Sequence, residues 1–141
     1  MAKIFLVEDN PDHALLISRA LEGSGDEVAR FHDGVSILDF FKKELKEEEL
    51  PVFVLLDLKL PGMDGFEILQ AIRAHLKYRL IPVVILTTSK HQREINRAYE
   101  LGASGFVTKS EDFSQLTEKL ARVKAYWLKT VELPESGQAN P

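Results

Sequence analysis

The sequence predicts an α/β domain in which helices cover both faces of a parallel sheet. Five short apolar segments alternate with five segments whose apolar residues recur at helical spacing. Two of the apolar segments, VFVLL at 52–56 and IPVVIL at 81–86, contain no polar residue, as is typical of strands buried on both faces. Strands and helices that alternate in this way form parallel sheets with helical crossovers.

The first half of the chain is expected to supply two strands and two helices. A strand at 4–7 precedes Asn10 and Pro11, which suit the cap and first turn of a helix that ends near Gly23 and Gly25. The buried stripe of this helix is predicted to be Leu16, Ile17, Ala20 and Leu21. A weaker strand at 27–31 and a turn at Asp33 lead into a helix with Ile37, Leu38, Phe40 and Phe41. We interpret the charged run KKELKEEEL that follows as its solvated end and a loop.

The second half adds three strands and three helices. After the strand at 52–56, Asp64 is expected to cap a helix, and the strand at 81–86 leads to a polar helix at 90–101. A strand at 104–108 and a helix at 112–129 follow. The predicted apolar stripes are Phe66, Leu69, Ile72 and Leu76 for the third helix and Phe113, Leu116, Leu120, Val123 and Trp127 for the last. We expect one domain over residues 1–130 and a flexible tail over 131–141.

Composition narrows the classes of function. The net charge of −4 gives no electrostatic reason to expect a nucleic acid as partner, and a chain without cysteine has neither disulfides nor thiolate chemistry. The start of the chain becomes acidic too early for a signal peptide, and no apolar stretch could span a bilayer, so we expect a cytoplasmic protein without a membrane partner. No DNA-binding domain is expected after the last helix. The histidines lack ligand spacing and are predicted to be solvated: His13, His32, His75 and His91.

Polar residues follow four of the five predicted strands. Ligands of an open parallel sheet bind at the carboxyl ends of its strands. Glu8 and Asp9 follow the first strand, Asp57 the third, Thr87 the fourth and Lys109 the fifth, whereas the weak second strand offers nothing obvious. An acid, a threonine or a lysine in one such position is usually a cap or a surface group, but the whole set indicates a site.

Three carboxylates at one edge repel one another and call for positive charge. Lys109 supplies one charge, and Mg²⁺, which prefers oxygen ligands, would supply two more. Asp9 and Asp57 are the expected direct ligands, and Glu8 could act through a bound water. This arrangement suits phosphoryl transfer with Asp57 as the nucleophile, Mg²⁺ and Lys109 as neutralising charges and Thr87 as a hydrogen-bond donor.

These residues make the chain similar to the receiver domain of bacterial two-component response regulators. The resemblance covers about residues 2–128 and rests on Glu8-Asp9, on Asp57 followed by LKLPGMDG, on Thr87 after IPVVIL and on Lys109 after GFVT. It implies a flavodoxin-like (βα)5 sandwich with strand order 2-1-3-4-5, helices one and five on one face and helices two to four on the other.

The resemblance also implies roles for individual residues. Asp57 would accept phosphate from the phosphohistidine of a sensor kinase, while Asp9, Asp57 and the backbone carbonyl of Lys59 hold Mg²⁺. Thr87 and Lys109 would then bind the phosphoryl oxygens, and Thr87 and Phe106 would move inward as a switch. That movement changes the surface formed by the fourth helix, fifth strand and fifth helix. Lys59 and Ser89 flank the site and would tune the lifetime of the phosphorylated form.

The segments YELGASGFVTKS and AYWLKTVELP are similar to those of single-domain regulators paired with phytochrome-type histidine kinases, which tend to dimerise through the last helix. A homodimer through the fourth helix, fifth strand and fifth helix is therefore expected, with two groups of apolar residues on its surface: Ile95, Ala98 and Tyr99, and Tyr126, Trp127 and Leu128. Trp127 could equally be a core residue.

Three residues depart from the usual receiver pattern: Glu8 replaces Asp, Phe106 replaces Tyr, and Ser110 replaces a proline that is usually preceded by a cis bond. The isomer of the Lys109–Ser110 bond is thereby left open.

Other functions stay open. A phosphorelay carrier would use the same site. A flavin-binding domain would need a loop after the first strand that cradles phosphate, where this chain has EDNPD. An aspartyl-phosphate hydrolase would need a second acid where Lys59 stands.

Overall fold

The computed structural model describes residues 2–23 and 25–135, and its centre is a five-stranded parallel sheet. The strands are β1 (Lys3–Val7), β2 (Glu27–Phe31), β3 (Phe53–Leu56), β4 (Val83–Thr87) and β5 (Gly105–Thr108). They lie in the order β2-β1-β3-β4-β5, and each neighbouring pair is parallel. The strand order confirms the flavodoxin-like fold expected from the resemblance.

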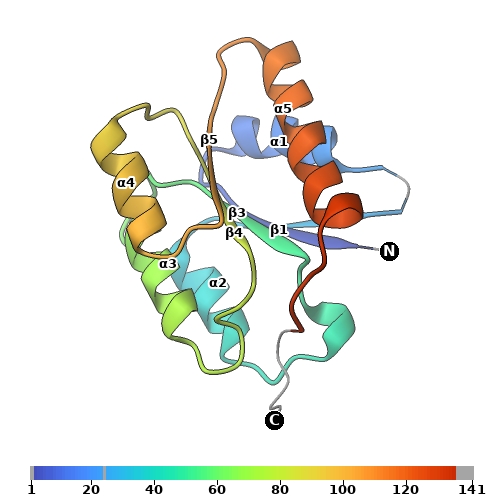
Figure 1. The fold of residues 1–141 in the computed structure, drawn as a ribbon, viewed down its shortest axis with the longest axis vertical. Helices are drawn as coiled ribbons and strands as arrows, with labels where there is room; N and C mark the ends of the chain where they lie inside the picture. The colour runs from blue at the N-terminus through green and yellow to red at the C-terminus, as the bar shows by residue number, and fades with distance from the viewer. Residues whose placement is uncertain (1, 24, 136–141) are drawn as a thin grey trace.

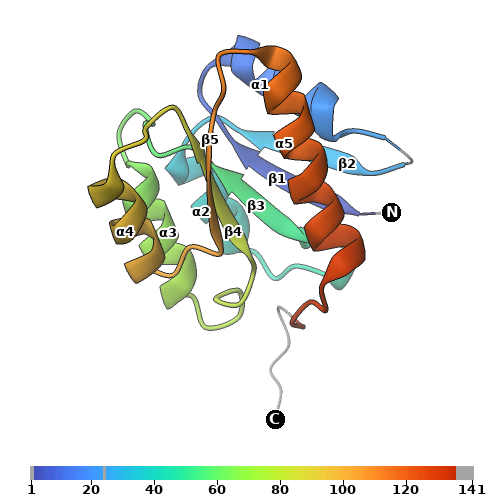
Figure 2. The same cartoon turned by 45° about the horizontal axis from the view of Figure 1, so that its top comes forward.

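Helices cover both faces of this sheet (Figure 1). They are α1 (Pro11–Leu21), α2 (Gly34–Phe41), α3 (Gly65–Ala74), α4 (Gln92–Glu100) and α5 (Phe113–Ala125). Figure 2 shows α1 and α5 on one face and α2, α3 and α4 on the other, as predicted. A 3₁₀ turn, η1 (Glu47–Glu49), occupies part of the charged run, and a π-helical turn, η2 (Tyr126–Thr130), continues α5. No helix in the described part of the chain is long and apolar enough to cross a bilayer.

The strands divide their side chains between two cores. Because successive side chains of a strand point to opposite faces, Phe5 and Val7 pack toward α2, α3 and α4, while Ile4 and Leu6 pack toward α1 and α5. The central strand β3 is buried on both faces, as its apolar sequence predicted. The edge strand β2 is only partly buried, which explains why its sequence signal is weak.

Capping residues set where the helices begin. Asn10, Asp33, Asp64 and Asp112 each accept a hydrogen bond from a backbone N–H in the first turn of the helix that follows. Asp64 also forms a reciprocal pair with Glu67, whose side chain accepts from the Asp64 N–H. The predicted structural role of Asp64 is confirmed.

Three predicted core residues are instead exposed, of which Leu16 and Phe113 lie on α1 and α5. In α1 the buried stripe is Ala14, Ile17 and Leu21, so that Leu16 lies to one side of it with 37% exposure. Phe113 is 46% exposed because it is the first residue of α5, outside the stripe of Leu116 and Leu120. The prediction for Leu16 was wrong because adjacent apolar residues in the middle of α1 do not by themselves define which side of the helix faces the sheet, and that for Phe113 because the first residue of a helix need not follow its buried stripe.

The end of α3 also differs from the prediction. The His75 ring accepts hydrogen bonds at Nδ1 from the backbone N–H groups of Lys77 and Tyr78, which end the helix. Its Nε2 therefore carries the hydrogen and donates to the Phe41 carbonyl at 3.2 Å. The chain turns away after Ala74, so Leu76 is 91% exposed and Tyr78 is buried in its place. His75 is thus a half-buried structural residue, and the prediction that it is solvated was wrong.

The last helical turn packs against the sheet. Trp127 stacks on Phe53 with ring centroids 6.5 Å apart, and both Trp127 and Leu128 contact the core under α1 and α5. The core interpretation of Trp127 is therefore favoured, while Tyr126 beside it is exposed. Of the predicted tail, residues 136–141 lie outside the described residues.

Candidate functional site

Four of the predicted site residues meet at the carboxyl edge of the sheet. Glu8 and Asp9 follow β1, Asp57 follows β3, and Lys109 follows β5. Glu8 is 1% exposed and Asp57 is 7% exposed, whereas Asp9 faces solvent. Two carboxylates buried at this depth need partners, since an unpaired buried charge is strongly unfavourable.

Lys109 is the partner of both. Its Nζ donates to Glu8 Oε1 at 2.5 Å and to Asp57 Oδ2 at 3.1 Å. The second Glu8 oxygen accepts from the Asn10 N–H at 3.2 Å. The only side-chain cation that this edge buries therefore bridges the ends of β1 and β3 from β5, within the described residues.

Burial and the contacts of this ion bridge shift the pKa values of Glu8 and Lys109. Burial raises the pKa of the Glu8 carboxyl above its ordinary value, and the neighbouring Asp57 charge adds to this, although Lys109 acts in the opposite direction. Burial alone would lower the pKa of Lys109, but the hydrogen bond to Glu8 and the charges of Asp57 and Glu8 outweigh it and raise that pKa. Lys109 therefore stays cationic, and further positive charge nearby would stabilise the buried Glu8 carboxylate.

The loop after β3 fixes Asp57 from its other side. Asp57 Oδ1 accepts a hydrogen bond from the Lys59 N–H at 3.1 Å. Gly65, the first residue of α3, donates its N–H to the Leu58 carbonyl. A Cβ on Gly65 would lie 2.5 Å from the Asp57 carbonyl oxygen, so only glycine allows α3 to approach Asp57 this closely. Gly65 was not predicted as a site residue, and its only sequence signal is its place next to the capping Asp64.

The predicted switch residues lie on β4 and β5, away from the bridge. Thr87 is fully buried, and its hydroxyl accepts a 3.4 Å hydrogen bond from the Ser89 N–H rather than contacting Asp57. Its carbonyl accepts from the Lys109 N–H at 2.7 Å, which ties the two residues through the backbone. Ser89 in turn donates to Glu94 of α4. Phe106 is partly buried against the core under α2, α3 and α4.

Two further residues near the site were missed by sequence reasoning. Arg30 of β2 donates to the carbonyls of Glu8 and Asp9 at 3.1 Å each, so the second strand does contribute a group to this edge. His13 of α1 is exposed, as predicted, but its Nδ1 lies 3.4 Å from Lys109 Nζ. Neither residue carries a sequence motif, because each acts through an atom that only the fold brings near.

The acidic groups have the geometry of a cation site. Carboxylate oxygens of Glu8, Asp9 and Asp57 lie within 4.8 Å of one another. Oxygen donors at this separation suit a hard divalent cation such as Mg²⁺. The exposed Asp9 leaves the site open toward solvent. The Lys109–Ser110 peptide, whose isomer the sequence left open, is trans, since the described residues contain no cis bond.

Several known proteins are similar to this chain in sequence and in fold. The chain is 41% identical to the probable methanogenesis regulatory protein FilR2 of Methanothrix harundinacea, over 89% of this chain and 83% of that protein. It is 34% identical to the response regulator Rcp1 of Synechocystis, over 93% of this chain and 92% of Rcp1. The crystal structure of the Mn²⁺-bound form of Rcp1 superimposes with a TM-score of 0.84 over 96% of this chain and 100% of that one.

A further crystal structure, that of the phosphorylated cyanobacterial phytochrome response regulator RcpA, superimposes with a TM-score of 0.86. The two proteins are 37% identical, and the match covers 95% of this chain and 99% of RcpA. The family model described as the response regulator receiver domain matches residues 4–121, which include Glu8, Asp57, Thr87 and Lys109. The chain therefore belongs to the response regulator receiver domain family.

Proposed function

We propose that this receiver domain accepts a phosphoryl group on Asp57 from the phosphohistidine of a sensor kinase. The observation that carries the proposal is the ion bridge: Lys109 reaches from β5 to hold Asp57 and Glu8 at once. A buried cation in contact with the acceptor carboxylate can neutralise charge that develops on a transferring phosphoryl group.

In the proposed step a carboxylate oxygen of Asp57 forms a bond to phosphorus. The bond from phosphorus to the donor breaks, and the leaving group keeps its electron pair and takes a proton from the donor side or from water. Lys109 then exchanges its contact with Asp57 Oδ2 for a contact with a phosphoryl oxygen. Nothing is oxidised or reduced.

Mg²⁺ would be held by Asp9, Asp57 and the backbone carbonyl of Lys59, with Glu8 acting through water. Three carboxylates with oxygens within 4.8 Å of one another support this assignment, since Lys109 is the one cation that forms an ion pair with them in the part of the chain that the structure describes. When bound, the ion supplies positive charge to the phosphoryl oxygens. The Mn²⁺-bound form of the relative Rcp1 also supports a divalent ion here.

The output of the domain is proposed to be a change of the α4-β5-α5 surface. Thr87 would leave its hydrogen bond with Ser89 and turn to the phosphoryl group, and Phe106 would move inward with it. Ser89 donates hydrogen bonds both to Thr87 and to Glu94 of α4. A movement of Thr87 would therefore also alter the contact between Ser89 and α4. The changed surface would bind a downstream protein or a second copy of this chain.

A phytochrome-type histidine kinase is the proposed partner, with likeness to RcpA and Rcp1 as support. Phosphotransfer from a set of purified kinases to this chain tests it, and the expected outcome is rapid transfer from a phytochrome-type kinase and slow transfer from the others. Neither a nucleic acid nor a membrane is proposed as partner, and the cytoplasmic location stays a prediction.

The alternatives have less support. A phosphorelay carrier would use the same Asp57, and onward transfer to a second histidine protein would reveal it. An aspartyl-phosphate hydrolase lacks its second acid, because Lys59 stands in that place. A flavin-binding domain would purify coloured, whereas we expect a colourless protein.

The phosphorylation itself can be tested without a kinase. With Mg²⁺ and acetyl phosphate, the intact mass of the protein should rise by one phosphate, and Asp57→Asn should abolish the gain. Asp64→Asn is the matched control, since Asp64 is an acid of the same loop that only caps α3, and this variant should gain the phosphate. A gain that survives Asp57→Asn would refute the assignment of the acceptor.

A further inference from the structure

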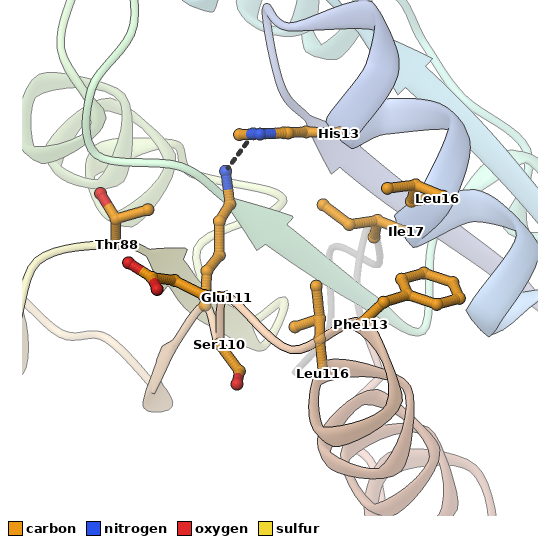
Figure 3. A pocket seen from close by; sticks show the side chains of 9 residues that line it. His13, Leu16, Ile17, Thr88, Ser110, Glu111, Phe113 and Leu116 are labelled. Carbon is orange, nitrogen blue, oxygen red and sulfur yellow. Dashed lines mark hydrogen bonds between the residues drawn. The ribbon is translucent and has the colours of Figure 1, made fainter.

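His13 stands at the polar end of a cavity of about 220 Å³ between α1 and the segment that joins β5 to α5. Figure 3 shows its ring opposite Thr88, Ser110 and Glu111, with Leu16, Ile17, Phe113 and Leu116 at the apolar end. The dashed line marks the contact of its Nδ1 with Lys109 Nζ. The cavity thus opens beside the ammonium that holds the proposed acceptor.

The contacts of Lys109 account for all its N–H groups. An ammonium has three donors and no acceptor. Its partners here are Glu8 Oε1 at 2.5 Å, Asp57 Oδ2 at 3.1 Å and His13 Nδ1 at 3.4 Å. Since Lys109 can only donate, His13 Nδ1 is the acceptor in this contact, which requires a neutral ring with its hydrogen on Nε2.

We propose that neutral His13 is a positioning residue that holds the Lys109 ammonium on Asp57, and that a proton on His13 Nδ1 releases it. The inference rests on the proposed function of Asp57 and Lys109. Protonation would replace the third acceptor of Lys109 with a donor of like charge 3.4 Å away. Lys109 would then leave its place over Asp57 more often, and phosphorylation would slow.

Imidazole is the side chain whose ordinary charge change falls between about pH 5 and 8, so the pH profile of phosphorylation is the property that tests this proposal. The charged groups that share the cavity with His13 are Lys109 and Glu111. Asp9 and Asp12 precede it along the chain, and Glu8 and Asp57 lie on the far side of Lys109. Thr88 and Ser110, the other polar groups of the cavity, are uncharged.

The His13→Gln variant tests whether the protonation of His13 affects phosphorylation. The glutamine side-chain oxygen can accept from Lys109 as Nδ1 does, but it does not titrate. His32→Gln is the matched control, because His32 is an exposed histidine directly after the edge strand β2. The initial rate of phosphorylation by acetyl phosphate and Mg²⁺ is measured by intact mass from about pH 8 to about pH 5.5 at constant salt, the range in which imidazole titrates.

We expect His13→Gln and wild type to agree within about twofold at the alkaline end, and His13→Gln to be about fivefold faster at the acid end, from a like-charge repulsion near the surface. His32→Gln should follow wild type throughout. Parallel profiles for wild type and His13→Gln, with Asp57→Asn still inactive, would overturn the role of His13 alone. A mass gain that persists in Asp57→Asn would instead overturn the proposed function.

A second readout does not depend on phosphorylation. In a long-range ¹H–¹⁵N NMR spectrum of the unmodified protein at the alkaline end, His13 should show a bare Nδ1 and a protonated Nε2. A hydrogen on Nδ1 would overturn the inference, because such a ring cannot accept from Lys109.

Discussion

At the scale of single residues, Glu8 and Asp57 are acidic groups that the fold buries beside each other. The raised pKa of Glu8 reflects burial first and the Asp57 charge as an additional cause, so its ionisation weakens the folded state at neutral pH. Under the proposed function, the cation and the phosphoryl group that bind at this site would compensate this unfavourable charge. Local sacrifice of stability for function is common at such sites.

Glu8→Gln should therefore raise the urea midpoint of unfolding at pH 7 without Mg²⁺. A carboxyl whose folded-state pKa is raised contributes stability below its unfolded pKa and loses it as pH rises through the folded value. The advantage of the variant should thus shrink as pH falls from the raised folded-state pKa of Glu8 toward about 4.5, the ordinary value, and should be absent below it. Added Mg²⁺ should stabilise wild type more than the variant.

Glu111→Gln serves as the control for Glu8→Gln, because it makes the same charge change at an exposed position. Its midpoint should stay near that of wild type with and without Mg²⁺. If Glu8→Gln is less stable than wild type at pH 7, the stabilising ion pair between Glu8 and Lys109 must outweigh the cost of burying the Glu8 charge.

Gly65 is a second residue on which the site depends. In Gly65→Ala, the new Cβ would lie 2.5 Å from the Asp57 carbonyl and 2.6 Å from Leu58 Cα. Both neighbours are backbone and cannot move cheaply, so we expect a loss of about 1–3 kcal/mol in the free energy of unfolding and slower phosphorylation.

Gly105→Ala is the comparison for Gly65→Ala, since its Cβ would make ordinary contacts at 3.7 and 3.8 Å with Val84. It should change the free energy of unfolding by no more than about 0.5 kcal/mol. Equal effects of the two substitutions in urea denaturation would rule out the close approach of α3 to Asp57 as the cause.

At the scale of elements, Arg73 ties α3 to the loops that lead into β4 and β5. Its guanidinium donates to the carbonyls of Gly102 at 2.8 Å and Ile81 at 2.7 Å, and to Ser104 Oγ at 3.3 Å. Burial lowers the pKa of Arg73, but a guanidinium stays charged at all ordinary pH values. This fork anchors the start of β5, the strand that carries Phe106 and leads to Lys109.

Arg73→Lys should lower the free energy of unfolding by about 2 kcal/mol, because an ammonium cannot reproduce the planar fork and leaves carbonyls without a donor. Arg79→Lys, at an exposed position nearby, should stay within about 0.5 kcal/mol of wild type. Urea denaturation measures both. Equal stabilities for the two variants would mean that water replaces Arg73 at no cost.

Most of the helices, strands and site residues were predictable from the sequence, but some contacts were not. The fold and the grouping of the site residues were predictable, because they follow from local signals: the alternation of strands and helices, the caps at Asn10 and Asp64, and the polar residues that end the strands. The grouped residues are Glu8, Asp9, Asp57 and Lys109. The end of α3 was not predictable, because it depends on His75 bonding two backbone groups beyond the helix. Arg30 and His13 were missed because their partners are more than twenty residues away in sequence.

At the scale of the whole molecule, the proposed output surface is formed by α4, β5 and α5, beside the sheet whose carboxyl edge carries the acidic residues. Exposed aromatic rings flank this surface: Tyr99 on α4 is 52% exposed, and Tyr126 at the end of α5 is 49% exposed. Figure 1 shows β5 between these two helices. Exposed apolar groups gathered on one side of a protein favour a partner surface.

We therefore predict that phosphorylation increases self-association, which light scattering over a range of concentrations measures. Tyr99→Glu should weaken the association of the phosphorylated form. Leu76→Glu, which places the same charge at a highly exposed apolar residue beyond α3, should leave it unchanged. The same mass for both phosphorylation states at every concentration would argue against this surface as a dimer interface.

The decisive observation for the whole account is the chemical nature and location of the phosphate. After treatment with acetyl phosphate and Mg²⁺, fragmentation mass spectrometry should place the phosphate on Asp57, and hydroxylamine should remove it, as it removes acyl phosphates. A phosphate that resists hydroxylamine, or one found on a serine or threonine, would contradict the assignment of Asp57 as the acceptor held by Lys109.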